Sequence, residues 1–244
     1  MYLFTIEGCI GSGKSTFIDI LKTHLKQLNG VPVVYIPEPV EEWESIVSEE
    51  GQNMIQLFYA DQQKYAFSFQ MMAYISRLSY LRKAIKQYPN CILISERSLH
   101  ADYHVFAKML HANGSIPQEN YHIYKKWFDE FIEDILVSGY IYMKTETDVC
   151  FDRCNKRARK GESSITLDYL DQCNKLHEEW LDTEYNVLTL HTNTVDDVDA
   201  VIEYISDEIP ANNKYNVLIC MSIFGFLACC NIIKIGFVLY RIFN

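Results

Sequence analysis

A glycine-rich segment near the N-terminus constrains the fold of this chain more than any other feature. Residues 8–15 read GCIGSGKS, which fits the pattern GxxxxGK[ST]. They follow the apolar run Leu3–Glu7 and open a helical stretch. In such a loop the backbone N–H groups point inward, and the helix N-terminus adds partial positive charge. The strand–loop–helix order predicts a P-loop in an α/β fold, whereas the alternative is a glycine-rich turn that only caps a helix.

The P-loop predicts a nucleoside triphosphate, ATP or another, accompanied by Mg²⁺. Lys14 is expected to meet the β- and γ-phosphates, and the hydroxyl of Ser15 is expected to face the metal ion. The residues assigned to the triphosphate in this loop are Gly8, Gly11, Ser12, Gly13, Lys14, Ser15 and Thr16. The loop does not identify the molecule that accepts the phosphoryl group, because GTPases, ATPases and small-molecule kinases share it.

Apolar runs and helical stretches alternate along residues 1–209, which predicts one α/β domain with three layers and a five-stranded parallel sheet. The expected strands are Leu3–Glu7, Val31–Ile36, Cys91–Glu96, Gly139–Met143 and Asn186–Leu190. The expected helices are Gly13–Leu28, Asn53–Lys86, Tyr121–Leu136, Asp148–Arg159, Tyr169–Leu181 and Val195–Ile209. Pro37 and Pro39 predict a loop after the second strand.

The C-terminal residues differ in composition from the α/β domain. Residues 210–216 read as a linker, and residues 217–233 carry no charge before Lys234. We expect an appended hydrophobic helix over 217–243, and we hypothesise that it anchors the domain to a membrane from the cytosolic side. The alternative is a helix that packs on the domain or on a dimer face.

Charge and cysteine content narrow the classes of function. The net charge of −10 argues against a protein that binds a nucleic-acid polymer, because such binding draws on a basic surface. The eight cysteines show no zinc-type spacing and no obvious disulfide framework. They predict reduced, mostly buried thiols and therefore a cytoplasmic location.

Two carboxylates stand at the carboxyl ends of the second and third expected strands, at the same rim of the sheet as the P-loop. Glu38 stands between Pro37 and Pro39, and Glu96 is followed by Arg97. Ligands bind at the carboxyl ends of parallel strands. A kinase that acts on an alcohol needs a base near the attacking hydroxyl, which Glu38 can supply. Glu96 is expected to contact Mg²⁺ or its water, and Arg97 is expected to contact the transferring oxygens.

Five collinear motifs resemble the deoxynucleoside kinase family, and specifically its deoxycytidine/deoxyguanosine kinase branch. Beside the P-loop they are Pro37–Val40 with Trp43, Phe67–Gln70, Ser76–Leu78, Glu96–Ser98 and the run from Arg153 through Arg157 to Arg159. The resemblance implies transfer of the γ-phosphate to the 5′-hydroxyl of a deoxynucleoside, with Lys14, Glu38 and Arg97 in catalysis. It also implies a homodimer.

The resemblance also implies a role for each matching position. Gln70 matches the residue that pairs with the base edge, and Tyr59 and Glu162 match the pair at the sugar 3′-hydroxyl. The remaining matches are Phe69 and Phe106 around the base, Trp43 and Ile55 in the pocket wall, and the lid arginines Arg153, Arg157 and Arg159. Two alternatives remain, since aromatic residues on one long helix are usually core, and the arginines could form a solvated face with Asp152 and Glu162 as partners.

Three positions bear on the preferred base. Ala73 is small, Arg77 is basic and Asp102 is acidic, a combination that in the resembling family marks the branch preferring deoxycytidine and purine deoxynucleosides over thymidine. The alternative is a structural salt bridge without influence on specificity. The sequence also departs from the family here, because Tyr103 stands where an arginine is common.

Two other functions compete with this interpretation. A nucleoside monophosphate kinase shares the P-loop and lid, but Glu38 would repel an acceptor that already carries phosphate. A non-catalytic, kinase-like assembly subunit would have no need for Lys14, Ser15, Glu38 and Arg97 together.

Overall fold

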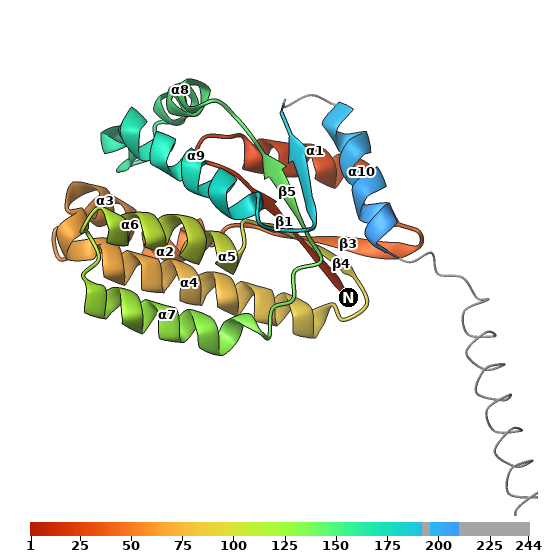
Figure 1. The fold of residues 1–244 in the computed structure, drawn as a ribbon, viewed down its shortest axis with the longest axis horizontal. Coiled ribbons are helices and arrows are strands. Elements are labelled where there is room, and N and C mark those ends of the chain that lie inside the picture. Colours follow the sequence, from red (N-terminus) through yellow and green to blue (C-terminus); the bar gives the residue numbers. More distant parts are fainter. Residues whose placement is uncertain (192–195, 210–244) are drawn as a thin grey trace, which may run out of the picture. The chain divides into compact units, whose positions relative to one another are not determined.

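The computed structural model describes residues 1–191 and 196–209 (Figure 1). The C-terminal helix expected over residues 217–243 and the linker expected over 210–216 lie outside the described residues. Met1–Glu208 forms one compact unit. Within the described residues, no helix is both long enough and apolar enough to cross a membrane.

The sheet has six strands in the order β2-β3-β4-β1-β5-β6. The bounds are β1 Tyr2–Glu7, β2 Gln27–Leu28, β3 Val31–Ile36, β4 Ile92–Glu96, β5 Gly139–Met143 and β6 Val187–Leu190. The five strands expected from the sequence are all present and parallel to one another, with bounds shifted by at most one residue.

The expectation of five strands was wrong by one short edge strand. β2 pairs antiparallel with β3 through Gln27↔Pro32 and Leu28↔Val31. Asn29 and Gly30 make the connection, with φ angles of 51° and 80°. Two positive φ angles in a two-residue loop are characteristic of a tight hairpin turn, and Asn-Gly is its strongest sequence signal. The helix expected to reach Leu28 therefore ends earlier.

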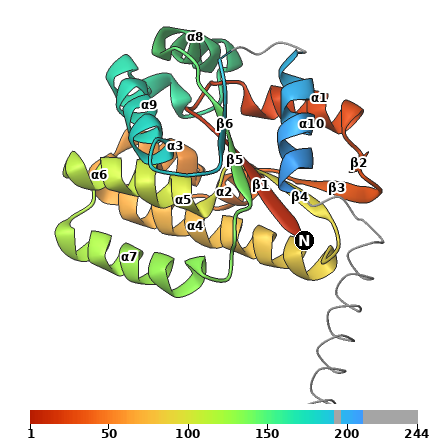
Figure 2. The ribbon, with the colours of Figure 1, turned by 45° about the vertical axis from the view of Figure 1, so that its right-hand side comes forward.

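The helices cover both faces of this sheet. Their bounds are α1 Lys14–His24, α2 Val40–Ser45, α3 Met54–Ala60, α4 Gln62–Gln87, α5 Leu99–Ala101, the π-helical segment η1 Asp102–Ala107, α6 Lys108–Ala112, α7 Gln118–Ile132, α8 Thr147–Arg157, the 3₁₀ turn η2 Glu162–Ser164, α9 Leu167–Leu181 and α10 Asp196–Glu208. Figures 1 and 2 show α1 and α10 on one face, and α4, α5, α6, α7 and α9 on the other. The expected three layers are present.

Three helical expectations need correction. The single helix expected over residues 53–86 is two helices, because Asp61 leaves the helical conformation (φ −149°, ψ 87°) and caps α4 by accepting from the N–H of Lys64. Helix α2 begins directly after Pro39, where only a loop was expected. The chain from Leu99 to Ala112 is also helical, although the sequence did not suggest a helix there.

The strand register brings the functional segments to one edge of the sheet. Ile6 of β1 lies opposite Glu96 of β4, and Ile36 of β3 lies opposite Ser95. The three strands therefore end at nearly the same level. The P-loop, the segment around Glu38 and the turn at Arg97 all leave the sheet at this edge, which is where ligands bind in parallel α/β sheets.

Candidate active site

A cavity of about 520 Å³ opens at this edge of the sheet, between the P-loop and helices α2, α3 and α4. It is lined by residues to which the sequence assigned roles: Gly11, Gly13, Lys14, Ser15, Thr16, Glu38, Trp43, Ile55, Tyr59, Phe69, Gln70, Ala73, Arg77, Glu96, Arg97, Asp102, Phe106, Arg153, Arg157, Arg159 and Glu162. Of the assigned residues, only Gly8 and Ser12 do not line its wall. Both contact Lys14 instead.

The P-loop forms a tight cradle around the side chain of Lys14. The ammonium group donates to the carbonyl oxygens of Gly8 (3.0 Å) and Cys9 (2.7 Å) and to Oγ of Ser12 (3.3 Å). Gly11 has a φ of 82°, and a Cβ there would lie 2.3 Å from the carbonyl oxygen of Cys150, so only glycine fits. Burial and the nearby Arg97 lower the pKa of Lys14 to about 8, although Glu96 and Glu38 oppose the shift.

Ser15 and Glu96 meet at the mouth of the P-loop. The hydroxyl of Ser15 donates to Oε1 of Glu96 over 2.7 Å, so the two expected metal contacts are adjacent. In the part of the chain that the structure describes, no group of three or more His, Cys, Asp or Glu residues could hold a metal ion. One hydroxyl and one carboxylate still fit Mg²⁺, which is usually held by one or two carboxylates, substrate phosphates and water.

Glu38 lies between two buried guanidinium groups. Its Oε1 accepts from Nη2 of Arg77 at 3.1 Å and from Nε of Arg97 at 3.3 Å. Burial alone would raise the pKa of this carboxyl, but the positive charges of Arg97, Arg77 and Lys14 hold it well below its usual value. Glu38 is therefore a carboxylate at neutral pH, as a base must be before it accepts a proton.

Arg97 connects the carboxylate to the P-loop. Its Nη1 donates to the carbonyl oxygen of Gly8 at 3.1 Å, and its guanidinium stacks over the ring of Phe106, 4.7 Å from the centroid. Its backbone has a φ of 68°, which is unusual for a residue with a side chain. Such strain tends to cluster at functional sites, where the surrounding structure compensates for it.

Arg77 and Asp102 form a buried ion pair in the wall of the cavity. Nε of Arg77 donates to Oδ2 of Asp102 at 2.9 Å, and Nη1 donates to the carbonyl oxygen of Glu96 at 2.9 Å. Gln70 lines the same cavity, is 3% exposed, and its Oε1 has no hydrogen-bond partner in the described structure. A buried polar atom left unpaired beside a cavity marks a place where a ligand can supply the missing donor.

Several aromatic residues form the wall of the cavity. Phe69 stacks on Phe58 with centroids 4.6 Å apart, and Trp43 meets the edge of Phe69 at 5.7 Å. One face of Phe69 is thus covered by Phe58, while Phe69 itself lines the cavity. Phe106 lines the cavity from η1.

The lid arginines have partners near the cavity mouth. Glu162 accepts from Nη2 of Arg157 at 2.7 Å and from Nη1 of Arg159 at 3.2 Å. Nη1 of Arg153 donates to the carbonyl oxygen of Ser12 at 3.0 Å, beside the triphosphate loop. The sequence had offered Glu162 both as a sugar contact and as a partner of these arginines, and in the described structure it is their partner.

Five cavity residues were missed from the sequence: Ile10, Phe17, Ile20, Phe58 and Tyr169. Phe58 precedes Tyr59 in an apolar helix. In such a helix the sequence does not distinguish a residue that lines a cavity from one that packs in the core. Tyr169 lies in the first turn of α9, and its ring meets the edge of Tyr59 at 6.3 Å. Only the contact of α9 with Tyr59 of α3 could have revealed it.

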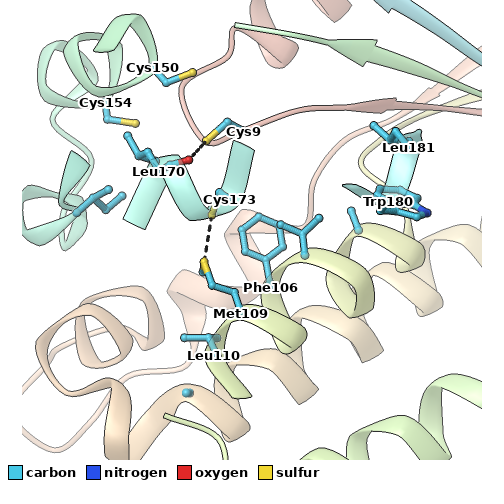
Figure 3. Packing of buried hydrophobic residues seen from close by; sticks show 14 of the residues in the cluster. Cys9, Phe106, Met109, Leu110, Cys150, Cys154, Leu170, Cys173, Trp180 and Leu181 are labelled. Carbon is cyan, nitrogen blue, oxygen red and sulfur yellow. Dashed lines mark hydrogen bonds between the residues drawn. The ribbon is translucent and has the colours of Figure 1, made fainter. Parts of the chain in front are cut away.

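Cys9 of the P-loop packs in one core cluster with cysteines of α8 and α9. Figure 3 shows Cys9 with its thiol donating to the carbonyl oxygen of Leu170 (3.5 Å), and Cys150 and Cys154 close by on α8. The described cysteines are free, and Cys9, Cys150, Cys154 and Cys173 are buried, as the sequence predicts for reduced thiols. They form part of the hydrophobic core that supports the loop.

Comparisons with known proteins agree with this geometry. The family described as "Deoxynucleoside kinase" matches residues 4–213. A probable deoxycytidine kinase of fowlpox virus (strain NVSL) is 38% identical over 197 residues, which cover 78% of this chain and 77% of the relative. Deoxycytidine kinase 2 of Gallus gallus is 32% identical over 197 residues, 72% of each chain. Mitochondrial thymidine kinase 2 of Homo sapiens is 30% identical over 178 residues, 72% of this chain and 63% of the relative.

The P-loop, the paired arginines around Glu38 and the cavity that they line thus occur in a chain that matches one family over nearly all of its described residues. The chain belongs to the deoxynucleoside kinase family and is a phosphotransferase that acts on nucleosides.

Proposed function

We propose that this protein transfers the γ-phosphoryl group of ATP, or of another nucleoside triphosphate, to the 5′-hydroxyl of a deoxynucleoside in nucleotide salvage. We further propose that it prefers deoxycytidine, deoxyguanosine and deoxyadenosine over thymidine. The observation that carries the proposal is the position of Glu38, which lines the same cavity as Lys14 and is held there by Arg77 and Arg97.

In the proposed reaction, Glu38 accepts the proton of the 5′-hydroxyl while that oxygen forms a bond to the γ-phosphorus. The bond from the γ-phosphorus to the bridging oxygen breaks, and the nucleoside diphosphate leaves with its electron pair. Both arginine contacts use Oε1, so Oε2 is the oxygen placed to take the proton. Lys14 and Arg97 stabilise the charge that spreads over the transferring oxygens.

Mg²⁺ fits this site and would be held by Ser15 and Glu96, where it would neutralise charge on the β- and γ-phosphates. Arg153, Arg157 and Arg159 would close over the same phosphates. Guanidinium groups suit this task because they bind phosphate oxygens in a bidentate manner. Closure would exclude water and limit hydrolysis of the triphosphate.

The proposed base preference rests on the buried Arg77–Asp102 pair and on Gln70. The Gln70 amide offers one acceptor and two donors to the edge of a base. The Asp102 carboxylate accepts hydrogen bonds, which favours a base with an exocyclic amino group. The 5-methyl group of thymine would instead lie against the space that this ion pair fills.

A direct test compares eight acceptors with γ-labelled ATP as donor: deoxycytidine, deoxyguanosine, deoxyadenosine, thymidine and their 5′-monophosphates. We expect the three non-thymidine nucleosides to be phosphorylated with higher kcat/KM than thymidine, and the monophosphates to be inert. Phosphorylation of the monophosphates alone would identify a nucleoside monophosphate kinase instead. Thymidine as the best acceptor would remove only the base preference.

We also propose that the enzyme acts in the cytoplasm as a homodimer. This part rests on the composition of the chain and on the family, and sedimentation equilibrium of the purified protein tests the dimer. A single species at the monomer mass of 28.5 kDa would contradict it.

A further inference from the structure

Ser76, a residue to which no role has been assigned, accepts a hydrogen bond from the indole ring of Trp43. The indole Nε1–H donates to Oγ of Ser76 over 2.9 Å. Trp43 is 6% exposed and Ser76 is 4% exposed, so both partners are buried. A buried indole N–H needs an acceptor, and Ser76 supplies it.

The hydroxyl of Ser76 is oriented by the helix on which it lies. Its Oγ is 2.7 Å from the carbonyl oxygen of Met72 and 3.1 Å from that of Ala73, one turn earlier on α4. Because the single O–H donates toward these carbonyls, its lone pairs are available to Trp43. Serine is a poorer helix former than alanine, so α4 itself gains nothing from this residue.

Trp43 belongs to the same short segment as Glu38. Helix α2 begins at Val40, whose N–H donates to the carbonyl oxygen of Glu38 at 2.8 Å. Arg77, the neighbour of Ser76 in sequence, donates to the Glu38 side chain. Adjacent residues of α4 therefore hold the two ends of the segment from Glu38 to Trp43, and both views in Figures 1 and 2 draw α2 against α4.

Trp43 also shapes the part of the cavity that would receive the base. Its ring meets the edge of Phe69 at 5.7 Å, and the guanidinium of Arg77 lies 5.9 Å from its centroid. It packs in one cluster with Ile55 and Ala73, which line the same cavity. A rotation of the indole would therefore change the pocket wall beside Phe69, Arg77 and Ala73 together.

We propose that Ser76 is a positioning residue for the deoxynucleoside: through the Trp43 N–H it fixes the indole as a wall of the base pocket. This inference rests on the proposed function. Ser76 does not line the cavity and does not touch the substrate, so its effect passes through Trp43.

The test is a double-mutant cycle of Ser76→Ala and Trp43→Phe, because phenylalanine keeps an aromatic wall and lacks the N–H. We expect Ser76→Ala to raise KM for deoxycytidine about tenfold, as loss of a partner for a buried donor implies. KM for ATP should stay within twofold. In the Trp43→Phe background, Ser76→Ala should add less than a twofold change.

The matched control is Ser79→Ala, the same substitution one turn further along α4 at a half-buried position outside the cavity wall. It should leave both KM values unchanged. If Ser76→Ala does not fold, Ser76→Thr and Ser76→Cys replace it. Threonine keeps the hydroxyl and should retain the wild-type KM, whereas the weakly accepting thiol should raise it.

Equal effects of Ser76→Ala in the wild-type and Trp43→Phe backgrounds would overturn the inference, as would an unchanged KM for the deoxynucleoside. A purely structural role would lower the active fraction and hence apparent kcat, with KM unchanged. Failure of the proposed function is separable, because wild-type enzyme would then phosphorylate none of the four deoxynucleosides.

Discussion

Arg77 donates to Glu38 through Nη2 over 3.1 Å, while its Nε donates to Asp102 over 2.9 Å. One buried guanidinium therefore joins Glu38, the proposed base for the 5′-hydroxyl, to Asp102, which is proposed to face the nucleobase. Its third group, Nη1, is bonded to the carbonyl oxygen of Glu96. The orientation of Arg77 is fixed on three sides, so its charge acts on Glu38 and on Asp102 at the same time.

Replacing Arg77 with Met should make the enzyme more sensitive to acid. Burial favours a raised pKa for Glu38, but Arg97 and Arg77 lower it, so loss of one arginine raises that pKa. Glu38 would then be protonated at a higher pH and could not act as a base. We expect the acidic limb of the kcat/KM profile to move up by about 1–2 pH units. An acidic limb at the wild-type position would show that Arg77 does not govern Glu38.

Replacing Glu38 with Gln should abolish turnover while the fold is retained. The amide has the shape of the carboxylate but cannot take the proton, and a positioned base contributes about 10²- to 10⁴-fold to rate. Single-turnover measurements should show this loss in the chemical step, with ATP binding preserved. Glu41→Gln, an exposed neighbour on α2, is the control and should be fully active. Comparable rates for the Glu38 variant and wild type would remove Glu38 from its proposed role.

The affinity for ATP should fall as the pH rises above about 8. Burial and Arg97 lower the pKa of Lys14 to about 8, so the empty site loses this positive charge above that pH. Binding of ATP must then be accompanied by uptake of a proton, which weakens it by up to about tenfold per pH unit. Titration calorimetry between pH 7 and 9.5 measures this. A Lys14→Arg variant should bind with a flatter profile because arginine stays charged; equal slopes for both would contradict the assignment.

A methyl group at Gly11 should be far more damaging than one at Gly30. Both glycines have φ near 80°, so alanine is strained at either position by about 1–2 kcal/mol. At Gly11 the Cβ would also lie 2.3 Å from the carbonyl oxygen of Cys150, whereas at Gly30 nothing lies within 4 Å. Urea unfolding should show a loss of about 3 kcal/mol or more for Gly11→Ala. Similar losses of stability for the two variants would show that α8 shifts at little cost to accommodate the added methyl group.

His177 should make the fold less stable as the pH falls below about 6.5. It is completely buried and its Nδ1 lies 2.7 Å from the carbonyl oxygen of Cys173; burial and the charges of Arg97 and Lys14 hold its pKa well below 6.5. Below pH 6.5 His177 takes up a proton in the unfolded chain but not in the native chain. The free energy of unfolding therefore falls by up to about 1.4 kcal/mol per pH unit.

The control is His177→Phe, which keeps an aromatic ring against Tyr142 and Phe106 but cannot be protonated. Urea unfolding of this variant should lose less stability between pH 7 and pH 5 than wild type does. Parallel losses in both proteins would assign the acid sensitivity to other groups.

Some of the fold could be predicted because its signals are local. The P-loop needs only glycines, Lys14 and Ser15 in the right order between a strand and a helix. The parallel strands are continuous apolar runs, since both of their faces are buried. The hairpin at Asn29–Gly30 also has a local signal, but the helical pattern before it continues to Leu28 and masks the short strand β2.

Other features depend on which of two competing interactions is stronger, and the sequence alone does not show which one prevails. The break at Asp61 is one of these, because its capping of α4 outweighs the apolar periodicity that runs through residues 53–86. The role of Glu162 is another, since the lid arginines occupy both of its oxygens in the described structure. Phe58 and Tyr169 carry no local mark that distinguishes a cavity wall from a core.

The sequence by itself predicted a triphosphate site, the carboxylates and guanidinium groups expected to line it, and membership of the family that the comparisons then showed. Only the tertiary structure decided which of these charges meet. Arg77 lies on α4, Asp102 on η1 and Glu38 in the connection between β3 and α2, so their contacts depend on how α4 packs against the sheet and η1. Which charges pair across such long sequence separations depends on how the helices and strands pack. No local sequence pattern encodes that packing.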